Sequence, residues 1–135
     1  LDLRVLDGPL PFEDHTVDAV ALVAVLSCIP EDSDQRALLA EIARVLRPGG
    51  LLTITEVPIQ DGERNQKRYE QDDSAYPFGT FETSDGGLIR HLHPTHLAEL
   101  LCDLDEVEHR RVVTRTMHGN DLVAVQISAT KPDAK

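Results

Sequence analysis

Val17-Asp18-Ala19-Val20-Ala21-Leu22-Val23 decides the fold, together with the later run Leu51-Leu52-Thr53-Ile54-Thr55-Glu56-Val57. The first run is apolar on both faces after Asp18, which is typical of a fully buried parallel strand. Between the two runs, apolar residues recur every three or four positions and predict a helix over residues 34–46, which Arg47-Pro48-Gly49-Gly50 ends. Strand, helix and strand in this order predict a right-handed parallel crossover and therefore an α/β fold.

The remainder of the chain predicts one helix, one hairpin and one irregular segment. Pro94 stands at a favoured first helical position and predicts a helix over residues 94–102. Residues 106–117 and 122–130 are strand-like, and the turn-forming residues between them predict an antiparallel pair. Residues 58–92 are polar and aromatic, and they are too long and irregular for an ordinary connection. We therefore expect a single domain, residues 1–135, with 58–92 as a functional insertion.

Composition excludes several classes of function. The 135 residues carry a net charge of −11, and basic residues form no cluster larger than Arg110-Arg111, so we expect no nucleic-acid partner. No apolar run approaches the roughly 20 residues that span a bilayer, so we expect no membrane partner. Cys28 and Cys102 lie in apolar segments without metal-site spacing, which predicts buried, reduced thiols and a cytoplasmic location. The chain opens with Leu1, and we expect residues upstream of it in the natural gene.

One combination of motifs resembles a known family. Asp7, Leu10-Pro11-Phe12, Asp18-Ala19-Val20, the helix ending in Arg-Pro-Gly-Gly and the apolar strand are similar in order and spacing to the C-terminal portion of class I S-adenosylmethionine-dependent methyltransferases of the type 11 kind. The resemblance implies a Rossmann-like, mostly parallel sheet with a C-terminal antiparallel hairpin, lacking the N-terminal strands. It also implies that residues 58–92 bind the methyl acceptor. The glycine-rich turn and the ribose-binding acidic residue of such enzymes are absent from this sequence.

The resemblance assigns cofactor-binding roles to five residues. Asp7 and Gly8 would meet the adenine ring of S-adenosyl-L-methionine, although Asp7 is equally a loop carboxylate that shapes the turn. Leu22, Val23 and Ser27 lie at or after the carboxyl end of the first strand, where open parallel sheets bind ligands. Core packing accounts for Leu22 and Val23 equally well, whereas the Ser27 hydroxyl needs a hydrogen-bond partner.

Residues 58–92 supply the candidates on the acceptor side. His91 or Tyr69 would deprotonate a hydroxyl or amine acceptor. Three aromatic side chains and one cation are expected to line the acceptor pocket: Tyr76, Phe78, Phe81 and Arg90. We expect Arg90 to contribute more to use of the acceptor than to folding stability. The alternative is that the aromatic residues only anchor the insertion. His91, His93 and His96 form a cluster, but no completed ligand set accompanies it, so no metal is predicted.

The function expected from these features is methyl transfer from S-adenosylmethionine to a small-molecule acceptor, with catalysis mainly by positioning. An alternative of another class is a non-catalytic, truncated module that self-associates as a homodimer through the edge of the strand at residues 17–23. A nicotinamide-binding half is disfavoured because no G-x-G-x-x-G follows a strand. We expect residues 1–135 by themselves to bind S-adenosylmethionine weakly or not at all.

Overall fold

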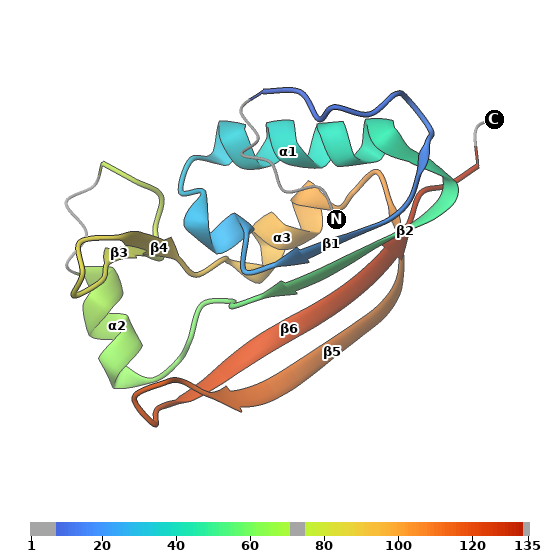
Figure 1. The fold of residues 1–135 in the computed structure, drawn as a ribbon. Coiled ribbons are helices and arrows are strands. Elements are labelled where there is room, and N and C mark those ends of the chain that lie inside the picture. The colour runs from blue at the N-terminus through green and yellow to red at the C-terminus, as the bar shows by residue number, and fades with distance from the viewer. Residues whose placement is uncertain (1–7, 71–74, 134–135) are drawn as a thin grey trace.

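The computed structural model describes residues 8–70 and 75–133, which form a mixed sheet covered by helices. The sheet has the strand order β1 (Val17–Val23), β2 (Leu46–Glu56), β6 (Asp121–Thr130) and β5 (Asp105–Arg115). β1 and β2 pair in parallel, whereas β6 is antiparallel to both β2 and β5 (Figure 1). The Rossmann-like strand–helix–strand unit and the terminal hairpin are confirmed. The described sheet has only one parallel pairing, because the hairpin returns β6 beside β2.

The second strand begins earlier than the sequence predicted. Helix α1 (Asp32–Val45) ends at Val45, so Arg47–Gly50 belong to β2 and do not form a separate helix stop. The backbone of this segment pairs with Lys131, near the C-terminus. The Gly49 N–H donates to the Lys131 carbonyl, and the Lys131 N–H donates to the Gly50 carbonyl. Tertiary pairing thus extends the strand across a Pro-Gly-Gly segment that local preference assigns to a turn.

The core lies between the sheet and two helices on one of its faces. α1 and α3 (Pro94–Leu100) cover the same face in Figure 1. Apolar side chains of β2, β6 and α1 fill the space between, including Leu52, Ile54, Ile127 and Ile42. Each contributes roughly 1.5–3 kcal/mol by leaving water. In the described part of the chain, no helix is long and apolar enough to cross a membrane.

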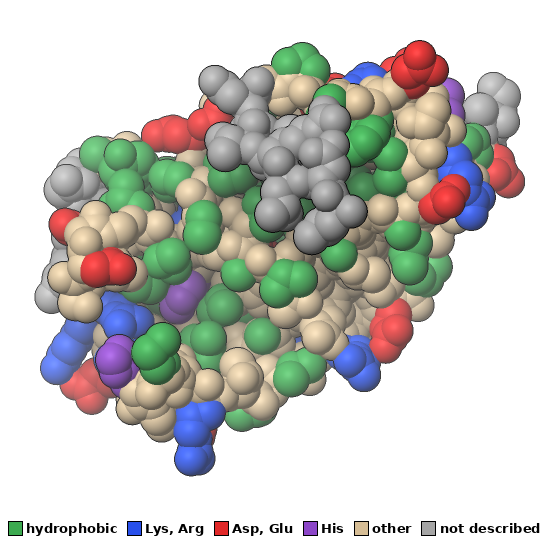
Figure 2. Space-filling model, in the orientation of Figure 1, with side chains coloured by type: hydrophobic (Ala, Val, Ile, Leu, Met, Phe, Trp, Pro, Cys, Tyr) green, Lys and Arg blue, Asp and Glu red, His purple; other side chains and the backbone are tan. Residues whose placement is uncertain are grey.

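β1 is an edge strand, not the fully buried strand predicted from its composition. Only Leu22 of its seven residues is buried, and Val23 is 68% exposed. In the described sheet no strand pairs with the outer edge of β1. A strand is fully buried only where other elements also cover both of its faces. Figure 2 shows hydrophobic side chains across the middle of one face of the molecule. The prediction of buried thiols is also wrong, because Cys28 at the end of a short 3-10 turn and Cys102 just after α3 are both exposed.

Residues 58–92 fold into α2 (Glu63–Glu70) and a two-stranded hairpin of β3 (Thr80–Glu82) and β4 (Leu88–Arg90). Figure 1 shows this segment at the end of the sheet where β1 and β2 finish. Leu92 holds the two ends of the segment together, since its N–H donates to the Val57 carbonyl and its own carbonyl accepts from the Ile59 N–H. The segment therefore lies over the carboxyl ends of the parallel strands, where ligands of α/β sheets bind.

Candidate functional site

The two candidate proton-transfer residues meet directly. Tyr69 lies on α2 and His91 follows β4, and both side chains are buried. The Tyr69 hydroxyl oxygen lies 2.6 Å from His91 Nδ1 and accepts a hydrogen bond of 3.0 Å from the backbone N–H of Gln60. Residues that are far apart in the sequence thus form one connected polar pair inside an apolar cluster.

Electrostatics keep both members of this pair uncharged at neutral pH. Burial, and next the positive charge of Arg68, lower the pKa of His91 to about 4. Burial raises the pKa of the Tyr69 phenol above its ordinary value. The pair therefore consists of a neutral imidazole and a neutral phenol.

Aromatic rings surround the pair unevenly. The Phe81 ring is buried edge-on against His91, with 4.9 Å between ring centroids, and the Arg68 guanidinium lies 4.8 Å from the Phe81 centroid. Phe78 contacts the Tyr69 ring at 5.4 Å but is 58% exposed, and Tyr76 is half-buried. The structure thus gathers Tyr69, Phe81 and His91, whereas only Phe78 and Tyr76 leave ring surface accessible. Assignment of these rings to an acceptor pocket remains a prediction.

Arg90 is buried and bonded within the chain. Its Nη1 donates to the Pro30 carbonyl at 2.9 Å and to Asp32 Oδ1 at 2.5 Å. Burial acts to raise the pKa of Asp32, but the hydrogen bond and charge of Arg90 outweigh it and the pKa is lowered. Arg90 therefore ties the insertion to the start of α1, which gives it a structural role besides the acceptor-binding role that the sequence suggested.

The loop after β1 is held by a buried carboxylate that sequence analysis missed. Glu56, the last residue of β2, accepts hydrogen bonds from the N–H groups of Leu26 at 2.8 Å and Ser27 at 3.3 Å. Burial raises the pKa of Glu56. The Ser27 hydroxyl has the partner it needed, because it donates to the Ala24 carbonyl at 3.2 Å. The polar groups of Ser27 are thus used by the fold.

The remaining cofactor candidates differ in accessibility. Leu22 is part of the core and Val23 is exposed at the strand end. Gly8 has a φ of +94° with open space where a Cβ would stand, and it lines a hollow of about 840 Å³ with Leu10, Ile29 and residues of α1. Asp7 lies outside the described residues.

The other histidines have separate tasks. His93 Nδ1 accepts the Thr95 N–H and caps α3, while His96 Nε2 lies 2.7 Å from Gln35 Oε1. His91 is bonded to Tyr69. Across residues 8–70 and 75–133, no group of three or more potential ligands is arranged to hold a metal ion.

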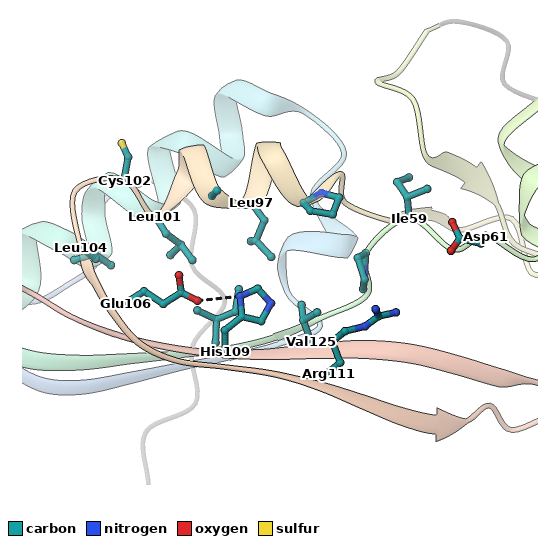
Figure 3. A pocket seen from close by; sticks show the side chains of 14 residues that line it. Ile59, Asp61, Leu97, Leu101, Cys102, Leu104, Glu106, His109, Arg111 and Val125 are labelled. Carbon is teal, nitrogen blue, oxygen red and sulfur yellow. Dashed lines mark hydrogen bonds and ion pairs between the residues drawn. The ribbon is translucent and has the colours of Figure 1, made fainter.

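A second hollow, of about 520 Å³, lies between α3 and the β5–β6 hairpin (Figure 3). Leu97, Leu101 and Val125 line it, and Glu106 Oε1 lies 2.9 Å from His109 Nδ1 along β5. None of the site residues predicted from the sequence lines this groove.

Gln60 is the other residue that sequence analysis missed. Its buried side chain accepts from the Val123 N–H and donates to the carbonyls of Val123 and Pro58, while its backbone N–H reaches Tyr69. No local motif distinguishes it. Glu56 did carry a signal, because a carboxylate closes an otherwise apolar strand at its carboxyl end.

Comparison with known proteins matches this architecture to one family. The family model "Methyltransferase domain" matches residues 2–54. The structure of an S-adenosylmethionine-dependent methyltransferase from Methanosarcina mazei superposes with a TM-score of 0.84 at 25% identity, covering 93% of this chain and 64% of that one. The chain has the fold of the class I methyltransferases, and residues 2–54 are similar to them in sequence.

Two further relatives of this chain are informative. A Burkholderia thailandensis 1,6-didemethyltoxoflavin-N1-methyltransferase, solved with 1,6-didemethyltoxoflavin and S-adenosylhomocysteine, superposes with a TM-score of 0.64 at 25% identity, over 95% of this chain and 47% of that one. The phthiotriol/phenolphthiotriol dimycocerosates methyltransferase 1 of Mycobacterium ulcerans is 48% identical over 48 residues, which are 36% of this chain and 17% of the relative. This chain therefore spans less than two thirds of the length of these relatives.

S-adenosylmethionine is the cofactor of these relatives. The described residues offer accessible positions for only part of such a molecule. Gly8 offers open backbone beside an apolar hollow, and Val23 is accessible at the carboxyl end of β1. Leu22 and Ser27 are engaged by the core and by backbone groups. The sequence lacks a glycine-rich turn for the methionine end. Assignment of Gly8 and Val23 to contact with the cofactor remains a prediction.

Proposed function

We propose that this chain carries the acceptor-side part of a site for methyl transfer to a small-molecule acceptor. The observation that carries the proposal is the Tyr69–His91 pair, which belongs to the segment 58–92 at the carboxyl ends of β1 and β2. When bound, S-adenosylmethionine would supply a methyl group activated by its positively charged sulfur, and the lone pair of the acceptor would receive that methyl group.

The residues of the chain serve this reaction mainly by position. The hydrogen bond of Arg90 to Asp32 and the buried hydrogen bonds of Glu56 to the backbone of Leu26 and Ser27 fix the loop after β1 against α1 and the insertion. Phe81 and Tyr69 exclude water from His91. Orientation and exclusion of water can provide about 7–11 kcal/mol in favourable cases, so a nucleophilic side chain is not needed.

Binding of S-adenosylhomocysteine to the isotope-labelled chain, followed by NMR, tests the proposal. We expect shifts at Gly8 and Val23 that saturate near millimolar concentration, about −4 kcal/mol, because only one side of the site is present. Gly8→Ala should abolish these shifts, whereas Gly119→Ala should not. The two glycines are matched, since both have positive φ and no atom within 4 Å of a new Cβ.

The outcomes separate cleanly. The absence of a shift at both residues, up to about 10 mM S-adenosylhomocysteine, would contradict the proposed function. A dissociation constant of tens of micromolar or tighter would instead contradict the prediction of weak binding and make the chain a competent cofactor binder.

The exposed edge of β1 favours the second function considered, a module that self-associates. β1 pairs on one side only within the described sheet, and Val23 at its end is 68% exposed. Unpaired apolar edges of this kind take up further strands. Sedimentation at several concentrations distinguishes the two functions, because a module of the second kind dimerises without binding S-adenosylhomocysteine.

A further inference from the structure

The hydrogen bonds around Tyr69 determine where its hydroxyl proton points. The Gln60 N–H already donates to this oxygen, at 3.0 Å. A phenol has a single proton to donate, and a buried tyrosine hydroxyl normally finds an acceptor. Among residues 8–70 and 75–133, the acceptor that the hydroxyl contacts is His91 Nδ1, at 2.6 Å. The Tyr69 proton is therefore directed at Nδ1.

This arrangement fixes the tautomer of His91. A ring nitrogen that accepts a hydrogen bond carries no proton, so the neutral imidazole has its proton on Nε2. His91 is neutral at physiological pH because burial lowers its pKa to about 4. Among the described residues, Nε2 has no hydrogen-bond partner, so its N–H is not used by the fold there.

Gln60 keeps the donor to Tyr69 in place. Its side-chain oxygen accepts the Val123 N–H at 3.1 Å, and its side-chain nitrogen donates to the carbonyls of Val123 and Pro58 at 2.9 and 2.8 Å. Its own carbonyl accepts from Gln66 Nε2 at 2.7 Å. The backbone of Gln60 is thus anchored to β6 and α2, which orients its N–H toward the hydroxyl.

We propose that His91 acts in the methyl transfer as a hydrogen-bond donor through Nε2–H, set by Tyr69 and Gln60, and that the acceptor is an oxyanion such as a phenolate or an enolate. The proposal rests on the proposed function and deepens it. It replaces the expectation that His91 or Tyr69 removes a proton, because Nδ1 is occupied and Nε2 already carries one.

The charges around the pair suit an anionic acceptor. Arg68 lies close enough for its positive charge to act on His91, and its guanidinium stands over the Phe81 ring. The negative charge of Asp61 raises the pKa of Tyr69 and opposes the effect of Arg68 on that group. The positive charge of Arg68 acts on His91 and would favour an oxyanion bound there. Such an acceptor becomes neutral on methylation and has no proton to release.

The proton assignment is tested without any reaction. Long-range proton–nitrogen NMR correlations of the histidine-labelled chain report which ring nitrogen is protonated, and His96 serves as an internal reference. We expect His91 in the Nε2–H form at pH 7. Tyr69→Phe should raise the pKa of His91, because the neutral form loses its donor, whereas Tyr76→Phe should leave it unchanged. An Nδ1–H form in the natural chain, or no rise in Tyr69→Phe, overturns the assignment.

The acceptor class is tested with 4-nitrophenolate and its methyl ether, 4-nitroanisole, as probes. We expect the phenolate to shift the His91 Nε2–H resonance and to bind roughly tenfold more tightly than the ether, which corresponds to one charge-assisted hydrogen bond. Equal binding of the two probes overturns the acceptor class. A chain that shows the Nε2–H form but no binding of S-adenosylhomocysteine contradicts the proposed function and leaves the proton assignment intact.

Discussion

Replacement of Arg90 by alanine should lower the free energy of unfolding more than the same replacement of an arginine in an exposed ion pair. The Arg90 side chain is only 6% exposed, and its Nη1 donates to the Pro30 carbonyl and to the Asp32 carboxylate. Hydrogen bonds that involve a charged group contribute about 1.5–3 kcal/mol each, but the Asp32 side chain is 40% exposed and water can replace part of its lost partner. We therefore expect a loss of about 2–4 kcal/mol.

Urea unfolding followed by far-ultraviolet circular dichroism measures this loss. With a slope of about 2 kcal/mol/M, the midpoint should fall by about 1–2 M. Arg47→Ala is the matched control, because Arg47 forms a similar Arg–Asp pair with Asp18 whose side chains are 51% and 82% exposed. We expect the control to lose no more than about 1 kcal/mol. Equal midpoints for the two variants would refute the reasoning that burial makes the Arg90 pair important.

Three further outcomes are expected. Glu56→Gln should gain stability relative to the natural chain as the pH rises above 4.5. The pKa of Glu56 is raised in the folded state, so the natural chain loses stability as this carboxyl ionises. Parallel pH profiles of the two chains in urea titrations would contradict this. Gly79→Ala should lower the thermal midpoint more than Gly119→Ala, because its Cβ would stand 2.4 Å from the His91 carbonyl oxygen whereas Gly119 faces open space; equal midpoints would argue against that steric clash. Val23→Lys should weaken any concentration-dependent dimer seen in sedimentation, and Val113→Lys on the opposite edge strand should not, so the reverse pattern would place the contact at β5.

Local patterns were sufficient to predict the order of elements. The apolar run of β1, the three- and four-residue spacing of α1 and the hairpin of β5 and β6 were each predicted near their observed positions, because each element's period is written into a short stretch of chain. The boundary at Leu46 was not, since β2 extends across Pro48 and Gly49 only by pairing with the far end of the chain.

The candidate site was predicted in part. Tyr69 and His91 were identified by residue type and by their place in an irregular segment, and the structure brings them into contact. Their protonation could not be predicted, because it depends on the backbone N–H of Gln60, whose position depends in turn on Val123 of β6. Arg90 was predicted to bind the acceptor. Its burial and its bond to Asp32 could not be predicted, because they arise from a contact between distant segments of the chain.

The sequence by itself determined the α/β class, the methyltransferase relationship and the residue types available for chemistry, because periodicity, glycine and proline positions and motif order are local properties. Only the tertiary structure decided which of those residues are free to act. Ser27 and Arg90 are engaged by Ala24 and Asp32, and the apolar strand β1 lies at an edge. The physical reason is that burial, pKa and hydrogen-bond partnership are set by neighbours far apart in the chain.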